Sequence, residues 1–380
     1  MKKSMFFALA ALGLVAMASC KKEEEKTPEA APELTNETQI TGIPFTGGEF
    51  TYEFDSNKKW TVAGDAEVTI EGQTYEFGLT PTSGDAGHGV VTVTVPANKG
   101  ATEISYSFTL TLLGEDKDTE PLTKTVILTI PAPSVTDAAG NTYKVVYLKD
   151  GNYWMAENLR YVPEGKTVSD DPTKGEIWYP YDFASLKAVK DEERIKTNGL
   201  FYTLETTLGT TLTLENIGNQ EKVQGICPKG WHIPSFEEAY ILFGGANALP
   251  ASCKLSKPYT EAYYYYADYK GGNVKEFNKV EPEANLKFVR SVAIAASGTA
   301  YQKTITGFEN SPMTNFWTST LYKAEKATIE EKEELDKIKS QNFAISLMAA
   351  KNNPDGKINL GYVKIKSGSS VRCVMDKPAK

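Results

Sequence analysis

Few residues in this 380-residue chain could do acid–base, nucleophilic or metal chemistry. It has two histidines, His88 and His232, and three cysteines beyond the first twenty residues, Cys227, Cys253 and Cys373. These are too few for a histidine-rich metal site or a cysteine–histidine nucleophile. A G-x-S-x-G elbow, H-E-x-x-H, a P-loop and a dinucleotide fingerprint are also absent from the sequence. We therefore expect no metal, no cofactor and no catalysis.

Carboxylate pairs are the catalytic alternative that stays open, because the chain has 49 acidic residues and two carboxylates are the machinery of glycosidic cleavage. The adjacent pair Glu237 and Glu238 follows Ser235, which begins an S-x-x-E capping box. Acidic side chains at this position cap the first turn of a helix. We interpret the pair as capping residues.

The stretch Gly225–Phe236 that leads into this box reads G-I-C-P-K-G-W-H-I-P-S-F. Trp231 and Ile233 alternate as in a short strand, and the proline after them ends it. The helix that follows has three apolar residues at helical spacing, Phe236, Tyr240 and Phe243. We predict a strand–turn–helix unit that forms a core, with its histidine in a structural role.

The first twenty residues predict a lipoprotein signal peptide. Two lysines precede an apolar run from Met5 to Met17, which is too short to span a bilayer, and Ala18-Ser19 precede Cys20. The segment resembles bacterial lipoprotein signals, which are cleaved ahead of an acylated cysteine, so Cys20 is the predicted lipidation site. An ordinary secreted protein with an incidental cysteine is the alternative.

Residues 21–36 predict a disordered tether, because K-K-E-E-E-K and a Pro-, Glu- and Ala-rich run cannot form a core. This start resembles the export signal that sends Bacteroidetes lipoproteins to the outer face of the outer membrane, and a plain charged linker is the alternative. We therefore expect a lipid-anchored outer-membrane protein that faces the cell exterior.

The charge distribution excludes nucleic acid as a partner. The chain carries −8, and removal of the leader, which has two lysines and no acid, leaves −10. Residues 35–133 alone hold 5 lysines and 14 acids, a balance of −9. Binding nucleic acid requires clustered basic residues that neutralise phosphates.

Residues 37–131 predict an all-β, immunoglobulin-like sandwich, because apolar residues recur at every second position in short runs separated by turns. Three pieces carry a family resemblance: T-G-G-E-F-T-Y-E-F before K-K-W-T-V, then S-G-D-A-G-H-G-V-V-T-V-T-V-P-A-N, and T-K-T-V-I-L-T-I. The stretch resembles the BACON domain of Bacteroidetes surface proteins. A second tryptophan expected in that family is absent, where Tyr75–Leu79 stands instead, so a passive spacer is an alternative to glycan binding.

A second domain begins after Pro131-Ala132-Pro133, with two strands expected to join at Asp150-Gly151. Five motifs follow in order: W-M-A-E-N-L-R-Y, G-L-F-Y-T-L-E-T-T, I-C-P-K-G-W-H-I-P-S-F-E-E-A, N-F-W-T-S-T and S-V-R-C-V-M-D. With these motifs, residues 134–377 are similar to the Fibrobacter succinogenes major paralogous domain. That resemblance implies an α+β, C-type-lectin-like fold related to formylglycine-generating enzymes. Leu204, where the family commonly has tryptophan, is a departure.

The resemblance also bears on the cysteines and on sugar binding. The related oxidases use a cysteine pair close together in sequence, which this chain lacks. The E-P-N, Q-P-D and W-N-D motifs of calcium lectins are also absent, and Glu281–Glu283 match the first of them only in part. After export, the three remaining cysteines allow one bridge. Because Cys227 and Cys373 lie in family-like motifs, and the resemblance places the last strand beside the central sheet, we expect these two to pair.

Charged insertions and aromatic clusters lie between the motifs. Ser185–Lys196 and Glu325–Ser340 are expected to be solvated helices. In the run Y-T-E-A-Y-Y-Y-Y-A-D-Y, side chains of a strand alternate, so one pair is expected to be exposed. The candidate ligand-binding residues are therefore Tyr263 with Tyr265 or Tyr264 with Tyr266, and more weakly Trp178 and Tyr179, because flat rings stack on sugars. A tyrosine-rich loop that packs on its own domain is the alternative.

The sequence thus favours a non-catalytic surface lipoprotein that recognises a glycan or a protein through its C-terminal domain. The alternative is a structural or assembly component of the cell surface, such as a pilus accessory subunit. An exposed aromatic platform would favour recognition, and an exposed strand edge or apolar groove would favour assembly.

Overall fold

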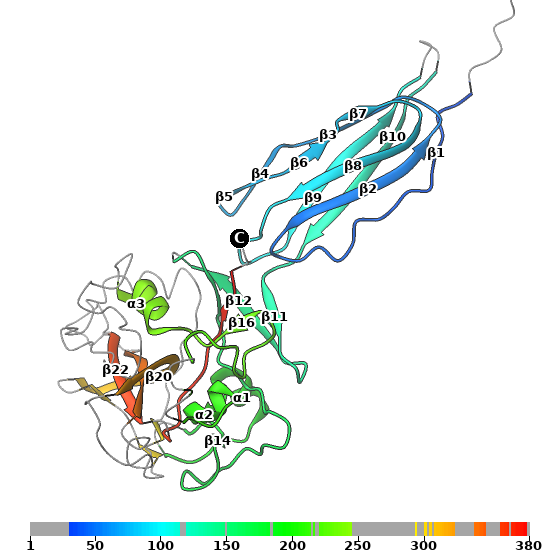
Figure 1. The fold of residues 1–380 in the computed structure, drawn as a ribbon. Helices are drawn as coiled ribbons and strands as arrows, with labels where there is room; N and C mark the ends of the chain where they lie inside the picture. The colour runs from blue at the N-terminus through cyan, green and yellow to red at the C-terminus, as the bar shows by residue number, and fades with distance from the viewer. Residues whose placement is uncertain are drawn as a thin grey trace, which may run out of the picture.

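The computed structural model of the chain describes residues 30–114, 119–148, 150–182, 185–213, 216, 220–244 and 366–377, and six strands between 293 and 364. These residues are mostly β-strand. An N-terminal all-β part and a C-terminal part lie end to end (Figure 1). Among the described residues, no helix combines the length and the apolar character needed to cross a bilayer.

The N-terminal part is a sandwich of two four-stranded sheets, with strand orders β1-β2-β8-β6 and β10-β9-β3-β7. A further pair, β4 with β5, extends from it. The strand bounds are β1 Leu34–Thr35, β2 Gly48–Ser56, β3 Trp60–Gly64, β4 Glu67–Ile70, β5 Gln73–Glu76, β6 Gly78–Thr80, β7 Ser83–Gly84, β8 Gly87–Val95, β9 Ile104–Leu112 and β10 Leu122–Ile130.

Apolar and polar residues alternate along these strands, so the apolar side chains form a core between the two sheets. Along β9 every second residue from Ile104 to Leu112 is buried, and the residues between them face outward. Phe77 and Tyr106 stack at 3.9 Å between ring centroids inside the sandwich. The prediction of an all-β sandwich is confirmed. His88 lies on strand β8, and its Nδ1 is 2.9 Å from Oδ1 of Asp55.

The chain enters the sandwich at the end away from the C-terminal part. There β1 pairs with the end of β2, Leu34 facing Ser56, while β10 leads into the C-terminal part (Figure 1). Strands of nine residues span about 30 Å at about 3.3 Å per residue. The sandwich therefore separates the entry of the chain from the C-terminal part by roughly its own length.

The C-terminal part is built on a five-stranded sheet of order β11-β12-β13-β23-β16. The bounds of these strands are β11 Ser134–Thr136, β12 Thr142–Tyr147, β13 Tyr153–Met155, β16 Trp231–His232 and β23 Val374–Met375. β12 and β13 form the hairpin predicted at Asp150-Gly151. The last described strand of the chain, β23, lies in the interior of this sheet.

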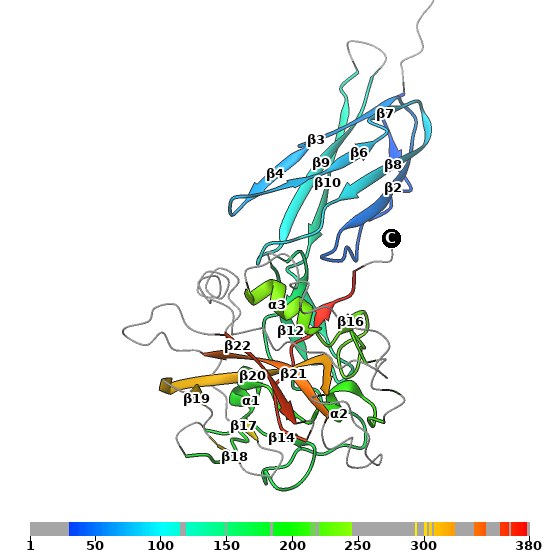
Figure 2. The ribbon, with the colours of Figure 1, turned by 60° about the vertical axis from the view of Figure 1, so that its left-hand side comes forward.

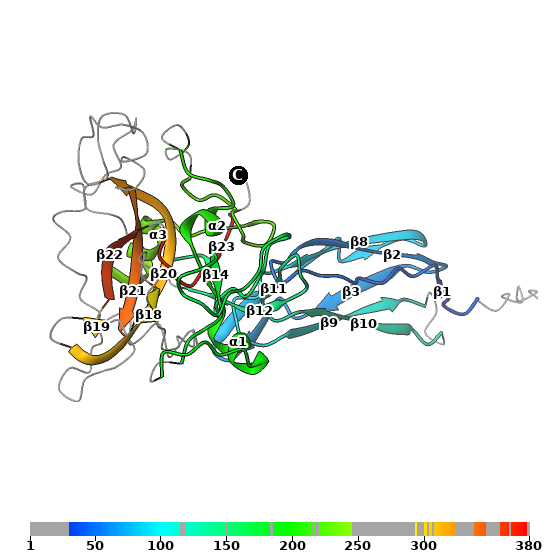
Figure 3. The same ribbon diagram turned by 90° about the horizontal axis from the view of Figure 1, so that it is seen from below.

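The other elements surround this sheet. Figure 3 shows the β19-β20-β21-β22 sheet at the end of the domain away from the sandwich, and Figure 2 shows α3 on the side toward the sandwich. The bounds are β14 Ile177–Trp178, α1 Glu192–Asn198, β15 Phe201–Tyr202, α2 Leu204–Leu208, α3 Phe236–Gly244, β17 Ala293–Ile294, β18 Ala300–Tyr301, β19 Thr304–Ile305, β20 Phe308–Lys323, β21 Ile338–Ser346 and β22 Ile358–Lys364.

The sequence motifs converge in the core of this domain. The indole N–H of Trp317 donates to the carbonyl of Tyr202 at 2.7 Å, and both residues are fully buried. The backbone N–H of Phe236 donates to the hydroxyl of Thr320 at 2.9 Å. Ile233 is fully buried as well. The strand–turn–helix unit is therefore a core element, as predicted.

Two helix predictions differ from the structure. Helix α1 begins at Glu192 rather than at Ser185, because the Asp191 side chain caps it by accepting from the backbone N–H of Arg194, and Leu186 has a left-handed φ of 56° that a helix does not allow. The predicted helix Glu325–Ser340 is wrong at its end, since β21 begins at Ile338 and pairs with β20 and β22. Its other residues lie outside those the structure describes.

Candidate functional site

Three motif segments meet at one end of the five-stranded sheet and line a hollow of about 380 Å³. β23 is the link, because Val374 pairs with Trp154 of β13 on one side and with His232 of β16 on the other. This register brings the β12–β13 turn, β16 and the residues after β23 together. We call the hollow the charged cleft, after its ionisable residues Asp150, Lys222, His232, Glu237, Glu238, Asp376 and Lys377.

His232 holds two carboxylates in the charged cleft. Its Nδ1 lies 2.6 Å from Oδ1 of Asp376, and its Nε2 lies 3.1 Å from both carboxylate oxygens of Glu238. Burial by itself lowers the pKa of the imidazole, but the hydrogen bonds and charges of Glu238 and Asp376 outweigh it, so the pKa is raised above its ordinary value. The imidazole ring thus joins helix α3 to the C-terminal segment.

Glu238 has a double role in this arrangement. Its carboxylate accepts from the backbone N–H of Ser235 at 2.9 Å, and its own N–H donates to the Ser235 hydroxyl at 3.1 Å, so the predicted capping box is confirmed. The same carboxylate lies 3.0 Å from the ammonium group of Lys222. Burial alone would raise its pKa, but His232, Lys222 and the Ser235 N–H lower it to about 2. Glu238 is therefore a fixed anion.

Asp150 forms the wall of the charged cleft at the β12–β13 turn. It accepts from the backbone and side-chain N–H groups of Asn152 at 3.1 and 2.9 Å and from the indole N–H of Trp154 at 2.8 Å. Burial raises its pKa more than these hydrogen bonds lower it. The turn is thus locked onto the strand that follows it.

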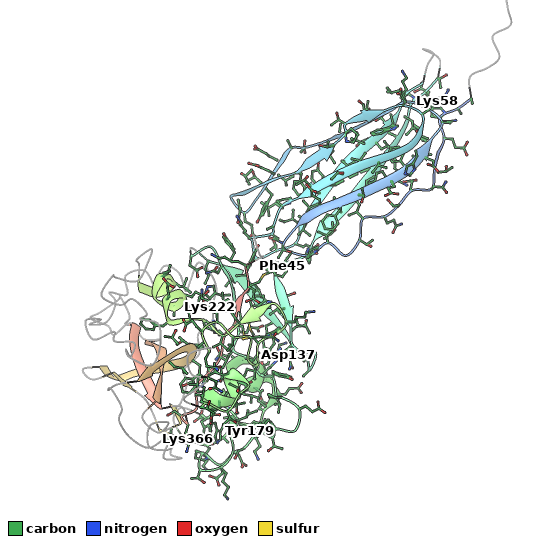
Figure 4. The ribbon with its side chains drawn as sticks, viewed as in Figure 1. Phe45, Lys58, Asp137, Tyr179, Lys222 and Lys366 are labelled. Carbon is green, nitrogen blue, oxygen red and sulfur yellow. A yellow bond between two sulfur atoms is a disulfide. The ribbon has the colours of Figure 1, made fainter. Side chains whose placement is uncertain are left out.

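The aromatic residues predicted from the sequence do not line the charged cleft. Trp178 is buried, and its indole N–H donates to the carbonyls of Asp171 and Lys174 at 3.1 and 2.9 Å, so it offers no exposed face. Tyr179 is partly exposed with Lys190 over its ring, and Figure 4 places it at the end of the domain opposite Phe45.

Several predicted residues lie outside the described part of the chain: Cys20, Cys253, Tyr263, Tyr264, Tyr265 and Tyr266. Their roles stay predictions. The predicted disulfide is present: Cys227 and Cys373 are bonded, with 5.9 Å between their Cα atoms and a sequence separation of 146. Both residues are buried in the core of the C-terminal domain.

Sequence reasoning identified the motifs but missed the cleft that they form. Lys222 and Asp376 gave no local signal, because each comes from a loop. The pairing of β16 with β23 brings Asp376 to His232, and Lys222 joins the group through its ion pair with Glu238. Asp150 could have been noticed, since the D-G turn places it beside the hairpin strands. Within the described residues, no group of three or more His, Cys, Asp or Glu side chains is arranged to hold a metal ion.

Comparison with curated proteins found no match. Among solved structures, the ASH/PapD-like domain 7 of human CEP192 is 19% identical with a TM-score of 0.21, over 33% of this chain and 97% of that chain. The class 5 fimbriae chaperone CfaA is 10% identical with a TM-score of 0.21, over 36% and 75%. A Bacteroides ovatus GH5 xyloglucanase in complex with a XXXG heptasaccharide is 14% identical with a TM-score of 0.19, over 41% and 38%. TM-scores this low carry no inference.

The family comparison is specific by contrast. The Fibrobacter succinogenes major domain matches residues 150–375, which is more than half of the chain. The matched range begins at Asp150 and ends at Met375, so it includes the charged cleft almost entirely and both disulfide cysteines. The chain belongs to the Fibrobacter succinogenes major domain family.

Proposed function

We propose that this protein is a lipid-anchored component of the outer membrane, facing the cell exterior, that recognises a glycan or a protein ligand through its C-terminal domain without chemistry. The signal peptide and Cys20 support the anchor. The charged tether, predicted at residues 21–36, supports export to the outer face, although its last residues differ from the prediction, since Leu34–Thr35 form strand β1 of the sandwich.

The two parts of the chain have different tasks in this proposal. The sandwich, which we propose is an immunoglobulin-like domain of the BACON type, acts as a spacer. The chain enters it at the far end, so a tether anchored there places the C-terminal domain at least about 30 Å further out. We assign a C-type-lectin-like fold to the C-terminal domain on its motifs.

The observation that supports a role in ligand recognition is the charged cleft. It combines a hollow of about 380 Å³ with several ionisable side chains whose pKa values depart from their ordinary range. Such groups cluster at functional sites, and sites for small ligands are concave with a few fixed polar groups. Glu237 and Lys377 line this cleft and form no hydrogen bond or ion pair with the described residues, so they can bind a ligand.

An assembly role is the second candidate, and one observation favours it. Strand β10 stands at the end of its sheet, and its residue Ile127 has an exposed fraction of 65%. An edge strand with an exposed apolar side chain is a site for pairing with another strand. In this case the C-terminal domain would pack against neighbours rather than select a ligand.

The anchor is tested on whole cells. Proteinase K should degrade the protein on intact cells, and Cys20→Ala should release it from membranes. Protection until the outer membrane is broken contradicts surface exposure.

Recognition is tested with the purified mature chain, on arrays of oligosaccharides and of peptides. Glu237→Gln should weaken binding, whereas Glu192→Gln, which changes an acidic residue in the first turn of α1, should not. If the two variants bind every array ligand equally, the charged cleft is not the recognition site.

A further inference from the structure

A second hollow adjoins the charged cleft, and both domains form its walls. It has a volume of about 540 Å³. Thr46 and Ala97 of the sandwich face Tyr153, Gly230 and Met375 of the C-terminal domain across it. We call it the junction hollow. It shares Asn152, Met375, Asp376 and Lys377 with the charged cleft, so the two hollows are neighbours.

The walls of the junction hollow are fixed relative to each other. The rings of Phe45 and Tyr153 meet edge to face at 5.1 Å between centroids, at the junction that Figure 4 marks with Phe45. The Tyr153 hydroxyl donates to the carbonyl of Asn98 at 2.9 Å, and the backbone N–H of Asn98 donates to the carbonyl of Phe45 at 2.7 Å. Lys99 lies over the ring of Tyr147 at 4.9 Å. A binding site assembled before the ligand arrives costs less conformational entropy on binding.

The two hollows differ in the chemistry that they offer. The charged cleft presents carboxylates, which only accept hydrogen bonds, beside lysines, which only donate them. A simple anion would face Glu237 and Asp376, and a simple cation would face Lys222 and Lys377. A hydroxyl group both donates and accepts, carries no charge, and pairs with either kind.

The junction hollow supplies the complementary surface. Its walls include the apolar parts of Ala97, Tyr153 and Met375, together with the glycine and small polar residues Thr46, Gly151, Asn152 and Gly230. Sugar rings have a hydroxylated rim and an apolar C–H face, and that face packs on aromatic and apolar side chains. Both hollows fall in the range of about 300 to 1,000 Å³ that is usual for small-ligand sites.

We propose that the charged cleft and the junction hollow form one binding site for a neutral oligosaccharide, built by both domains. The sugar hydroxyls pair with the charged cleft, and the C–H face of a neighbouring sugar unit packs in the junction hollow. This inference rests on the proposed function; it names the class of the ligand and adds the junction hollow to the binding site. It makes the sandwich part of the site rather than a spacer alone.

The probe is an array of neutral hexose and pentose oligosaccharides of three to six units, with acidic oligosaccharides and peptides in the same format, applied to the mature chain. Ala97→Trp fills the junction hollow from the sandwich side and should weaken binding of a neutral oligosaccharide at least about tenfold. Glu237→Gln replaces a charged hydrogen-bond acceptor by a neutral one and should also weaken binding of the neutral oligosaccharide about tenfold. Ala101→Trp, an exposed change in the same loop, and Glu192→Gln should stay within about twofold.

Each other outcome overturns a defined part of the inference. If the chain binds no neutral oligosaccharide, or if binding survives Ala97→Trp while the fold is intact by circular dichroism, the shared site is refuted. If peptides bind and Glu237→Gln weakens them, the ligand class is wrong and the proposed function stands. If ligands bind but Glu237→Gln weakens none of them, the charged cleft is not the recognition site; if the chain binds no ligand of either array, the proposed function itself fails. Should Ala97→Trp not fold, Thr46→Phe fills the hollow from the same side.

Discussion

Replacing Glu238 with glutamine removes one charge from the centre of the charged cleft and keeps the shape of the side chain. The amide oxygen of Gln can still accept from the Ser235 N–H, so the helix cap is retained. The pKa of Glu238 is lowered from 4.5 to about 2, which corresponds to about 3 kcal/mol of stabilisation of the anion in the folded state. Part of this comes from the cap, so we expect Glu238→Gln to lower the free energy of unfolding at pH 7 by about 2 to 3 kcal/mol.

The pH dependence has a definite sign. A carboxyl group with a lowered pKa stabilises the fold fully above its unfolded pKa of about 4.5, and this contribution is lost as the pH falls through about 2. The raised pKa of His232 acts in the opposite direction: its contribution is present below about 6.5 and is lost as the pH rises through its folded pKa. Both contributions coincide between about pH 4.5 and 6.5. Glu238→Gln should flatten the acid side of this profile.

Urea unfolding followed by tryptophan fluorescence measures the effect, because four of the five tryptophans lie beyond residue 134. A loss of 2 to 3 kcal/mol should lower the urea midpoint by about 1 M. Glu237→Gln is the matched control and should change the free energy of unfolding by less than about 0.5 kcal/mol. A Glu238→Gln variant as stable as the wild type at pH 7, or a deficit that is the same at pH 7 and pH 2.5, would refute the reasoning.

Three further predictions concern the framework. Changing both Cys227 and Cys373 to serine should lower the free energy of unfolding by up to about 5 kcal/mol, because the bridge closes a loop of 146 residues. Non-reducing peptide mapping of the wild type should give the Cys227–Cys373 peptide pair. A bridged peptide that contains Cys253 contradicts this pairing. Gly225→Ala should destabilise the domain by at least about 1 to 3 kcal/mol in thermal melts, because φ is +52° and a Cβ would lie 2.2 Å from the carbonyl oxygen of Thr207; an unchanged melting temperature argues against this geometry. Asn98→Ala removes side-chain hydrogen bonds to two backbone carbonyls at the junction and should increase domain motion in small-angle scattering; an unchanged profile would show that other contacts fix the junction.

Local patterns made much of the fold predictable. The alternation at Ile104–Leu112 sufficed for a sandwich strand, and Ser235 with Glu238 sufficed for a capped helix, because each depends on residues only a few positions apart. The disulfide needed a family resemblance, since no local pattern pairs residues 146 positions apart. The start of helix α1 was predicted wrongly because the residues before Asp191 are compatible with both a helix and a loop. The side-chain cap at Asp191 and the left-handed backbone at Leu186 determine where the helix begins.

The charged cleft was not predictable for a different reason. Glu238 was correctly expected to cap its helix, but nothing near it in sequence indicates that the same carboxylate also binds His232 and Lys222. Asp376 lies 144 residues from His232 and reaches it only through the pairing of β16 with β23. The short strands that create this contact have two residues each, too few for any periodicity.

The interior position of β23 has a consequence for the order in which the chain can fold. The sandwich is formed by one continuous stretch that ends at Ile130, so it can fold as soon as that stretch has been synthesised. The C-terminal sheet cannot be completed at that stage, because β13 and β16 are joined through β23, which begins 142 positions after His232. The hairpin of β12 and β13 can form early, whereas β16 has no strand to pair with until β23 follows. We expect a chain that is cut before β23 to contain a folded sandwich and an unfinished second domain.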